Sequence, residues 1–213
     1  SLVPPADPMI GVLGGTFDPV HFGHLRPALE GMQAIGLEQV RFLPNRIPPH
    51  RETPWLNVEN RLELLKTAIG DQPGFELDQR ELQREGHSYM VDTLESLRND
   101  FPSHPVCLIL GMDAFLGLKQ WHQWQRIPEL CHLVVTTRPG FEVSGDFIRQ
   151  LPATLVTETS GLFELAAGRI LLQSVTQLDI SASHIRAMLA KGQSVRYLLP
   201  DEVNNKLMKM VKN

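Results

Sequence analysis

Residues 14–24 read Gly14-Gly15-Thr16-Phe17-Asp18-Pro19-Val20-His21-Phe22-Gly23-His24, and they follow the apolar run MIGVL at 9–13. The run predicts a buried strand, and the glycines predict a turn into a helix over about 24–35. Two glycines let a ligand approach the backbone without meeting a side chain. The helix start offers unpaired N–H groups and a positive dipole end, which suit phosphate. The stretch therefore predicts a strand–turn–helix unit with an anion site at its turn.

Outward from this unit, apolar runs alternate with helical periods. Further strands are predicted at 40–43, 75–77, 106–110, 132–136 and 170–172, and helices at 57–69, 89–99, 181–191 and 201–211. Such alternation favours an α/β fold, with a mainly parallel sheet and helices on both faces. Residues 141–167 have weak periodicity and predict no definite element. Ligands of such sheets bind at the carboxyl ends of strands, which is where the motifs below lie.

Composition limits the classes of function. The 213 residues carry a formal net charge of −4, which argues against a general nucleic-acid binder. Two cysteines, Cys107 and Cys131, make no disulfide framework and fit a reducing compartment. No segment is apolar for long enough to span a bilayer, so we expect a cytoplasmic protein without a membrane partner. Residues 1–8 are expected to be a disordered leader or an artificial remnant, and 9–213 one domain with a small helical part at about 180–213.

His21 and His24 are three residues apart and can share one face of the first helical turn. Gly23 between them removes a side chain that would block an approach. A zinc site would need three or four ligands, and no second His/Cys cluster has a matching spacing. The same spacing would also fit an acid–base pair, or two residues that merely start the helix. The strand–turn–helix context favours phosphate binding.

GGTFDPVHFGH resembles the HxGH motif of the nucleotidyltransferase superfamily, and the chain from about residue 9 to its last helix resembles the bacterial nicotinate-nucleotide adenylyltransferases. The resemblance implies a Rossmann-like, doubly wound nucleotidyltransferase domain. It also implies ATP and nicotinate mononucleotide as substrates, and deamido-NAD and pyrophosphate as products, in NAD biosynthesis. In this motif it assigns ATP binding to Gly14, Gly15, Thr16, Phe17, His21 and His24.

A second motif, Ile180-Ser181-Ala182-Ser183-His184-Ile185-Arg186, begins the helix at 181–191. Ser181 is a good N-cap, and Arg186 carries a permanent charge that can pair with phosphate oxygens. Alone, the motif is typical of a capped helix with a surface arginine. It resembles the family's ISxTxxR motif, with Ser183 in place of threonine. The resemblance implies that Ile180, Ser181 and Arg186 bind ATP opposite the histidines, and that His21, His24 and Arg186 are catalytic.

Gly111-Met112-Asp113 follows the strand at 106–110. A glycine and an acid at a strand's end could bind ribose hydroxyls. Asp113 could instead cap a helix, and both roles can hold at once. The resemblance implies that Gly111 contacts ATP, and that Asp113 contacts both ATP and the acceptor nucleotide.

The proline-rich loop at 44–54 carries Asn45, Arg46, His50 and Arg51. Two arginines and a histidine make a local anion site in an acidic protein, unless they are merely solvated loop charges. The segment resembles the family's PNxxPPHK/R loop, which lies over the acceptor nucleotide. The resemblance thus assigns acceptor binding to Asn45, His50 and Arg51, and also to Arg138, which matches an arginine near the phosphates.

Ser88-Tyr89-Met90-Val91-Asp92-Thr93 resembles the family's SYTxxTL segment, but Met90 stands where threonine is usual. Methionine has no hydroxyl to donate to the nicotinate carboxylate. The main-chain N–H of Met90 and the ring N–H of His122 could donate in its place, so the preference for nicotinate over nicotinamide stays open. The resemblance assigns ring stacking to Trp121 and leaves Trp124 a packing role. Tyr89, Met90, Trp121 and His122 complete the predicted acceptor site.

The expected mechanism is in-line attack by the acceptor phosphate on the α-phosphorus of ATP, without a covalent intermediate. Mg²⁺ is expected to bind mainly through the ATP phosphates, with no protein metal site. Nicotinamide mononucleotide or phosphopantetheine as acceptor, a cytidylyltransferase, and a non-catalytic nucleotide sensor are the competing interpretations. The sequence leaves the oligomeric state open between monomer and dimer.

Overall fold

The computed structural model describes residues 7–46 and 53–212. Over these residues the strands form one seven-stranded sheet in the order β3-β2-β1-β4-β5-β7-β6, and every pairing is parallel. Its strands are β1 (Ile10–Gly15), β2 (Gln39–Pro44), β3 (Phe75–Leu77), β4 (Val106–Gly111), β5 (His132–Thr137), β6 (Thr154–Val156) and β7 (Arg169–Ser174).

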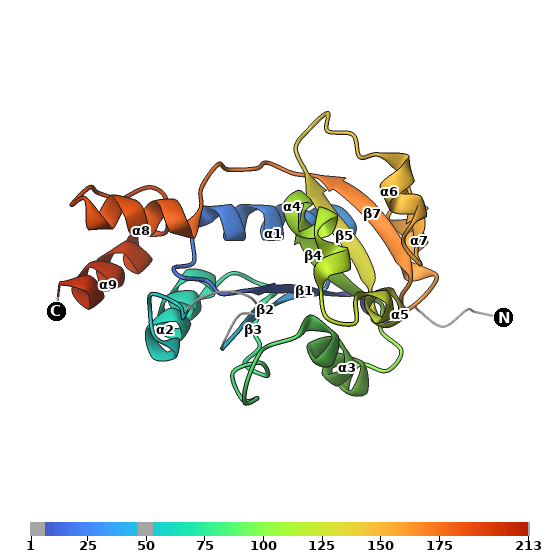
Figure 1. Ribbon diagram of the computed structural model, residues 1–213, viewed down its shortest axis with the longest axis horizontal. Coiled ribbons are helices and arrows are strands. Elements are labelled where there is room, and N and C mark those ends of the chain that lie inside the picture. Colours follow the sequence, from blue (N-terminus) through green and yellow to red (C-terminus); the bar gives the residue numbers. More distant parts are fainter. Residues whose placement is uncertain (1–6, 47–52, 213) are drawn as a thin grey trace.

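Helices cover both faces of this sheet (Figure 1). They are α1 (Phe22–Ile35), α2 (Val58–Ile69), α3 (Met90–Asp100), α4 (Met112–Leu116), α5 (Ile127–Leu130), α6 (Gly145–Arg149), α7 (Ser160–Phe163), α8 (Ala182–Ala190) and α9 (Asp201–Val211), with 3₁₀ turns η1 (Leu118–Gln120) and η2 (Trp124–Arg126).

The core is divided by the sheet into two layers. Cys107 and Ile109 of β4 pack into the layer that contains α1, α2, α8 and α9. Their neighbours Val106 and Leu108 pack into the layer with α3, α4 and α5. Successive strand residues point to opposite faces, so both sets are apolar when helices cover both sides. The uninterrupted apolar run of β4 follows from this burial.

The strand order reverses between β1 and β4. From β1 the chain builds β2 and β3 on one side of the sheet and then returns to start β4 on the other. The two strands pair only from Ile10↔Val106 to Val12↔Leu108, although each continues for three more residues. Their carboxyl ends therefore diverge and open a crevice at the switch point, where ligands of such sheets bind.

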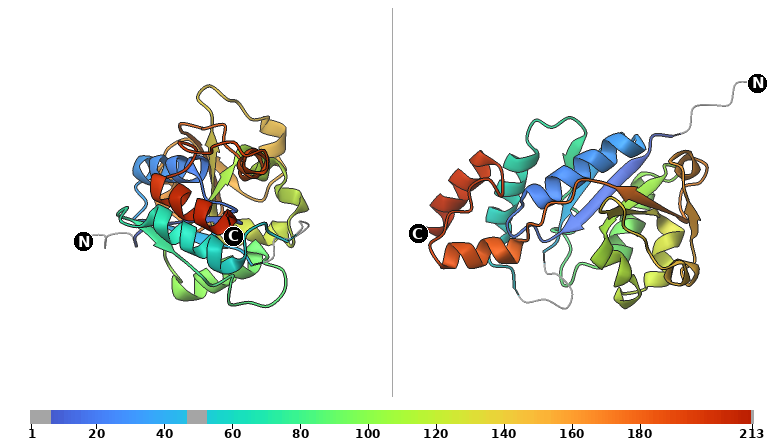
Figure 2. Two further views of the ribbon diagram at one scale, coloured as in Figure 1. Left: turned by 90° about the vertical axis from the view of Figure 1, so that its left-hand side faces the viewer. Right: turned by 90° about the horizontal axis from the view of Figure 1, so that it is seen from above.

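The last two helices pack at one end of the sheet. α9 lies beside α2, with the Lys206 Nζ atom 2.9 Å from the Thr67 Oγ1 atom (Figures 1 and 2). Val203 and Leu207 of α9 and Ile185 of α8 are fully buried in the layer of α1 and α2. This packing fixes the start of α8 against the turn after β1.

The predicted α/β class, with a parallel sheet covered on both faces, is confirmed, as are the predicted elements outside 141–167 to within two residues. The stretch 141–167 holds α6, β6 and α7, which the sequence did not predict. β6 is an edge strand of three residues with Thr154 and Leu155 exposed, so no apolar run or alternation marks it. No helix within the described residues is long and apolar enough to cross a membrane.

Candidate active site

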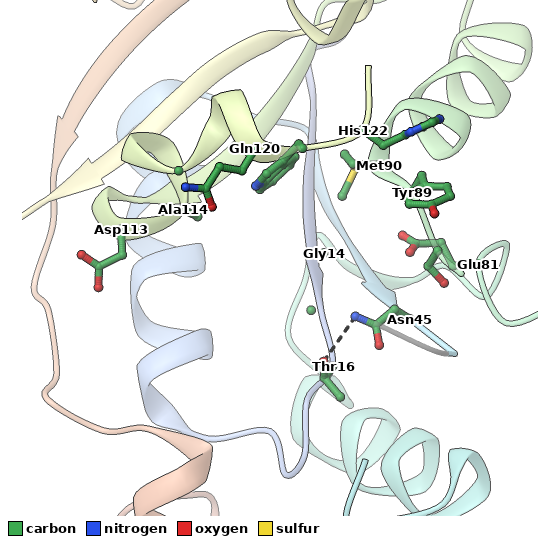
Figure 3. A pocket seen from close by; sticks show the side chains of 14 residues that line it. Gly14, Thr16, Asn45, Glu81, Tyr89, Met90, Asp113, Ala114, Gln120 and His122 are labelled. Carbon is green, nitrogen blue, oxygen red and sulfur yellow. Dashed lines mark hydrogen bonds between the residues drawn. The ribbon is translucent and has the colours of Figure 1, made fainter. Parts of the chain in front are cut away.

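A cavity of about 450 Å³ lies at the carboxyl ends of β1 and β2 (Figure 3). The glycine turn, the start of α3 and the segment after β4 supply its walls. Nine predicted site residues line it, namely Gly14, Gly15, Thr16, Asn45, Tyr89, Met90, Asp113, Trp121 and His122. We call this space the first cavity.

A second cavity, of about 920 Å³, lies on the other side of the β1 terminus. Its wall contains apolar side chains together with the predicted residues His24, Gly111, Asp113 and Arg138. Asp113 and Ala114 line both cavities. The two spaces therefore meet at the start of α4, beside the glycine turn.

The two histidines cap α1 reciprocally. The His21 Nδ1 atom accepts the Gly23 N–H at 3.0 Å, and the His24 Nδ1 atom accepts the His21 N–H at 3.1 Å. Their rings stack with centroids 3.8 Å apart. Because each Nδ1 accepts, each neutral imidazole carries its proton on Nε2. Both histidines therefore start the helix, and this role leaves their Nε2–H groups available as donors.

Both imidazoles are held neutral near pH 7. Burial lowers the pKa of His21 to about 4. Burial, and next the neighbouring His21, lower the pKa of His24 well below its usual range. Neutral donors side by side avoid the repulsion that two imidazolium groups would experience.

Residue 23 must be glycine because two neighbouring groups lie too close for a side chain. A Cβ atom there would lie 2.8 Å from His21 Cε1 and 3.1 Å from the Ile180 carbonyl oxygen. The second approach shows that the motif at 180–186 adjoins the histidine motif. Ser181 caps α8 as predicted, accepting the His184 N–H at 3.1 Å.

Arg186 is anchored across this junction. Its Nη1 atom donates to the Asp18 carbonyl oxygen at 2.8 Å and lies 3.7 Å from the Asp18 Oδ2 atom. The Asp18 carboxylate also accepts the N–H groups of Trp55 and Leu56, at 2.7 and 2.8 Å. Asp18 thus holds the turn, α8 and the segment before α2 in one arrangement.

Arg61 of α2 links the segments that follow β1 and β2. Its side chain is 1% exposed, and Nη1 donates to the carbonyl oxygens of Thr16 and Asn45 at 2.8 and 2.7 Å. Asn45 in turn donates to the Thr16 Oγ1 atom at 3.3 Å. The Asn45 Oδ1 atom has no partner among the described residues, so it can accept a hydrogen bond from a ligand.

Aromatic side chains form the far wall of the first cavity. Tyr89 and His122 stack with ring centroids 4.3 Å apart, and Trp121 lies half-buried beside them. Trp124 packs on the core layer of α3 and does not line the cavity. The predicted division between a site tryptophan and a packing tryptophan agrees with these positions.

Met90 is the first residue of α3, and the preceding Tyr89 makes no side-chain cap. Ser88, Tyr89 and Met90 line the first cavity, so the start of this helix borders it with N–H groups that no side chain caps, and such groups suit a carboxylate. A Cβ atom at Gly14 would lie 2.7 Å from the Met90 Cε atom. The thioether thus fills the space that glycine leaves at the end of β1.

Three predictions need correction or comment. Gly111, not Asp113, is the N-cap of α4, and Asp113 lies in the first turn. Arg138 lines the second cavity, although it was predicted with the acceptor residues. His50 and Arg51 lie outside the described residues.

Three residues near the site were not assigned roles from the sequence: Asp18, Arg61 and Glu81. Arg61 lies on the apolar face of α2 with Leu64 and Leu65, and this spacing could have indicated its burial. Glu81, 3% exposed, lines the first cavity. It lies in a charged loop, where a sequence predicts only solvated side chains.

No group of three His, Cys, Asp or Glu side chains within 7–46 and 53–212 is arranged to hold a metal ion. Asp113 is the acid that lines both cavities. One carboxylate beside substrate phosphates is a donor set that suits Mg²⁺, which keeps several of its waters.

Comparison with known proteins agrees with this geometry. The cytidylyltransferase-like family matches residues 12–188. A "probable nicotinate-nucleotide adenylyltransferase" of Aeromonas hydrophila is 46% identical, with 92% of each chain covered. A protein of the same name from Halorhodospira halophila is 48% identical, covering 93% of this chain and 92% of that one.

Among solved structures, the nicotinic acid mononucleotide adenylyltransferase of Plasmodium falciparum superposes with a TM-score of 0.72, covering 96% of each chain. Its sequence identity of 14% supports the fold alone. The match over 12–188 and the two curated relatives, each covered nearly whole, extend across both cavities. The chain belongs to the cytidylyltransferase-like family and, within it, to the nicotinate-nucleotide adenylyltransferases.

Proposed function

We propose that the protein transfers the adenylyl group of ATP to nicotinate mononucleotide, giving deamido-NAD and pyrophosphate. The observation that carries the proposal is the pair of cavities that meet at Asp113, beside the glycine turn. Two substrates, one on each side, would have their reacting phosphates together at the end of β1. The relatives' names support the acceptor's identity.

The first cavity suits the acceptor nucleotide. Trp121 offers a stacking surface for the pyridine ring, and the uncapped start of α3 at Met90 offers N–H donors to its carboxylate. Asn45 Oδ1 and the Thr16 hydroxyl line the same space nearer the turn. His50 and Arg51, in the part of the chain left undescribed, remain predicted acceptor contacts.

The second cavity suits the adenosine of ATP. Its apolar wall accommodates a purine, and Gly111 leaves open space where a Cβ atom would stand. Asp113 is placed to accept hydrogen bonds from ribose hydroxyls. Arg138, at the end of β5, adds a permanent positive charge near the phosphates.

Catalysis follows from position and hydrogen bonding. An oxygen of the acceptor phosphate attacks the α-phosphorus, the bond from that phosphorus to the bridging oxygen breaks, and pyrophosphate leaves. The nucleophile is already an anion, so no side chain has to remove a proton. The His21 and His24 Nε2–H groups would donate to the triphosphate, and Arg186 would supply the permanent charge. Bound magnesium would neutralise part of the phosphate charge, with Asp113 the adjacent carboxylate.

One assay compares the acceptors. The enzyme is incubated with magnesium ATP and, separately, nicotinate mononucleotide, nicotinamide mononucleotide and phosphopantetheine, and pyrophosphate is measured. We expect release with nicotinate mononucleotide at the highest kcat/KM. Faster release with phosphopantetheine would overturn the acceptor, and no release with any acceptor would favour a nucleotide sensor.

A further inference from the structure

The first cavity contains a buried carboxyl group that the mechanism above does not use. Glu81 is 3% exposed, and its Oε2 atom has no hydrogen-bond partner among the described residues. Figure 3 shows the carboxyl group directed into the space bordered by Met90, Tyr89 and Asn45. A polar atom so buried, facing a ligand cavity without a partner, indicates that the ligand completes its hydrogen bonds.

The surroundings of Glu81 carry few compensating charges. Arg84 of the same loop and the hydroxyl groups of Thr93 and Ser88 stabilise its ionised form, whereas Asp78 repels it. Tyr89, His122 and Asp113 are the other titratable groups that line the cavity, and Tyr89 lies beside Glu81 (Figure 3). Burial dominates and raises the pKa of Glu81 to about 7, so both protonation states are accessible near neutral pH.

The proposed acceptor brings a second acid into this space. Its pyridine carboxylate is ionised at any pH near neutrality, and the start of α3 at Met90 lies next to Tyr89 and Glu81 on the cavity wall. Two ionised carboxylates are unfavourable in one water-poor cavity, where a shared proton turns repulsion into a hydrogen bond. A carboxamide in the same place can instead donate its N–H to an ionised Glu81.

We propose that Glu81 is a specificity-determining residue: neutral, it donates a hydrogen bond to the carboxylate of a nicotinate acceptor, and ionised, it favours a carboxamide acceptor. Binding the acid-bearing nucleotide then takes up one proton from solvent at Glu81. This inference rests on the proposed function, because it assigns the acceptor to the first cavity.

The test is the ratio of kcat/KM for nicotinate mononucleotide to that for nicotinamide mononucleotide, from pH 6 to 8.5. The acceptor phosphate, ATP and the two histidines of α1 are common to both reactions, so their titrations cancel. We expect the wild-type ratio to fall about tenfold or more over this range, because a site that needs one proton loses up to about tenfold per pH unit above its pKa. Where the amide is converted too slowly, its inhibition constant replaces its kcat/KM.

Three variants locate the titrating group. Glu81→Gln, which stays neutral, should make the ratio constant within about twofold. Glu85→Gln removes a charge from an exposed position of the same loop and should reproduce the wild-type fall. His122→Gln should also keep the fall, because the titration is assigned to Glu81. A role in folding alone would lower activity with both acceptors equally and leave the ratio's pH dependence intact.

The inference is overturned if the wild-type ratio does not change with pH, or if the fall persists in Glu81→Gln or disappears in His122→Gln. The wild-type profile tests it even if Glu81→Gln fails to fold. Absence of turnover with both acceptors would instead contradict the proposed function. If nicotinate mononucleotide is converted but the ratio of the two kcat/KM values does not change with pH, this inference alone is overturned.

Discussion

Two replacements of His24 separate the structural and catalytic uses of its imidazole. The Nδ1 atom accepts the His21 N–H at 3.1 Å, and the Nε2–H group is free to donate. Asparagine places its amide oxygen near the Nδ1 position, so His24→Asn keeps the cap and loses the donor. Glutamine reaches the Nε2 position with its amide N–H, so His24→Gln keeps a donor and loses the cap.

We expect His24→Asn to lose mainly kcat and His24→Gln to lose mainly stability. Loss of one donor to a transition-state oxyanion costs about 3–4 kcal/mol, so kcat of His24→Asn should fall about 100- to 1000-fold. Its unfolding free energy should fall less than that of His24→Gln, because the cap remains, whereas both variants lose the ring stacking on His21. His24→Gln should lose about 1 kcal/mol of stability, or about 2–4 °C in Tm, and keep kcat within about tenfold of wild type.

Steady-state kinetics at saturating substrates and thermal unfolding of both variants provide the comparison. The reasoning is refuted if His24→Asn is stable and turns over within about fivefold of the wild type. It is also refuted if the two variants lose kcat equally, because the Nε2–H donor would then not distinguish them.

Three further perturbations have defined outcomes. The folded pKa of His21, about 4, lies below its ordinary 6.5, so its stability contribution is complete above pH 6.5 and is lost as pH falls towards 4. In urea titrations, the wild type should therefore lose about 3 kcal/mol more stability between pH 7.5 and pH 4 than His21→Asn loses. Trp121→Ala should raise the acceptor KM about tenfold or more through lost stacking, whereas Trp124→Ala should lower Tm and leave that KM unchanged. Gly23→Ala should lower kcat about tenfold or more, because its Cβ atom would displace the His21 ring 2.8 Å away.

Each of these has a contrary result. An identical loss of stability in wild type and His21→Asn between pH 7.5 and 4 would assign the acid sensitivity to other groups. Equal KM values in the two tryptophan variants would remove Trp121 from the acceptor site. Wild-type kcat in Gly23→Ala would show that the position of the His21 ring does not limit turnover.

The sequence was informative where local chemistry decides the structure. The strand before Gly14, the capping Ser181 and the apolar run of β4 each follow from nearest-neighbour preferences, and the structure has them as predicted. The resemblance then added that the histidine motif and the motif at 180–186 act together. In the structure the two motifs adjoin where Gly23 approaches Ile180.

The rest depends on tertiary packing that no local pattern encodes. Glu81 is a charged residue in a polar loop, and only the packing of that loop against α3 buries it. The Asp18 carboxylate accepts the N–H groups of Trp55 and Leu56, which lie 37 and 38 residues further along the chain. Thr154 and Val156 of β6 favour a strand, but three residues are too few for a pattern to predict one, and the pairing with β7 completes it at the sheet edge.

The central claim is direct adenylyl transfer between substrates that meet at the glycine turn, and the configuration at the α-phosphorus tests it most directly. The enzyme is supplied with one diastereomer of ATP carrying sulfur on the α-phosphorus, together with nicotinate mononucleotide. In-line attack predicts a thio-substituted deamido-NAD with inverted configuration at that phosphorus. Retained configuration would require an intermediate on the protein and would contradict the account.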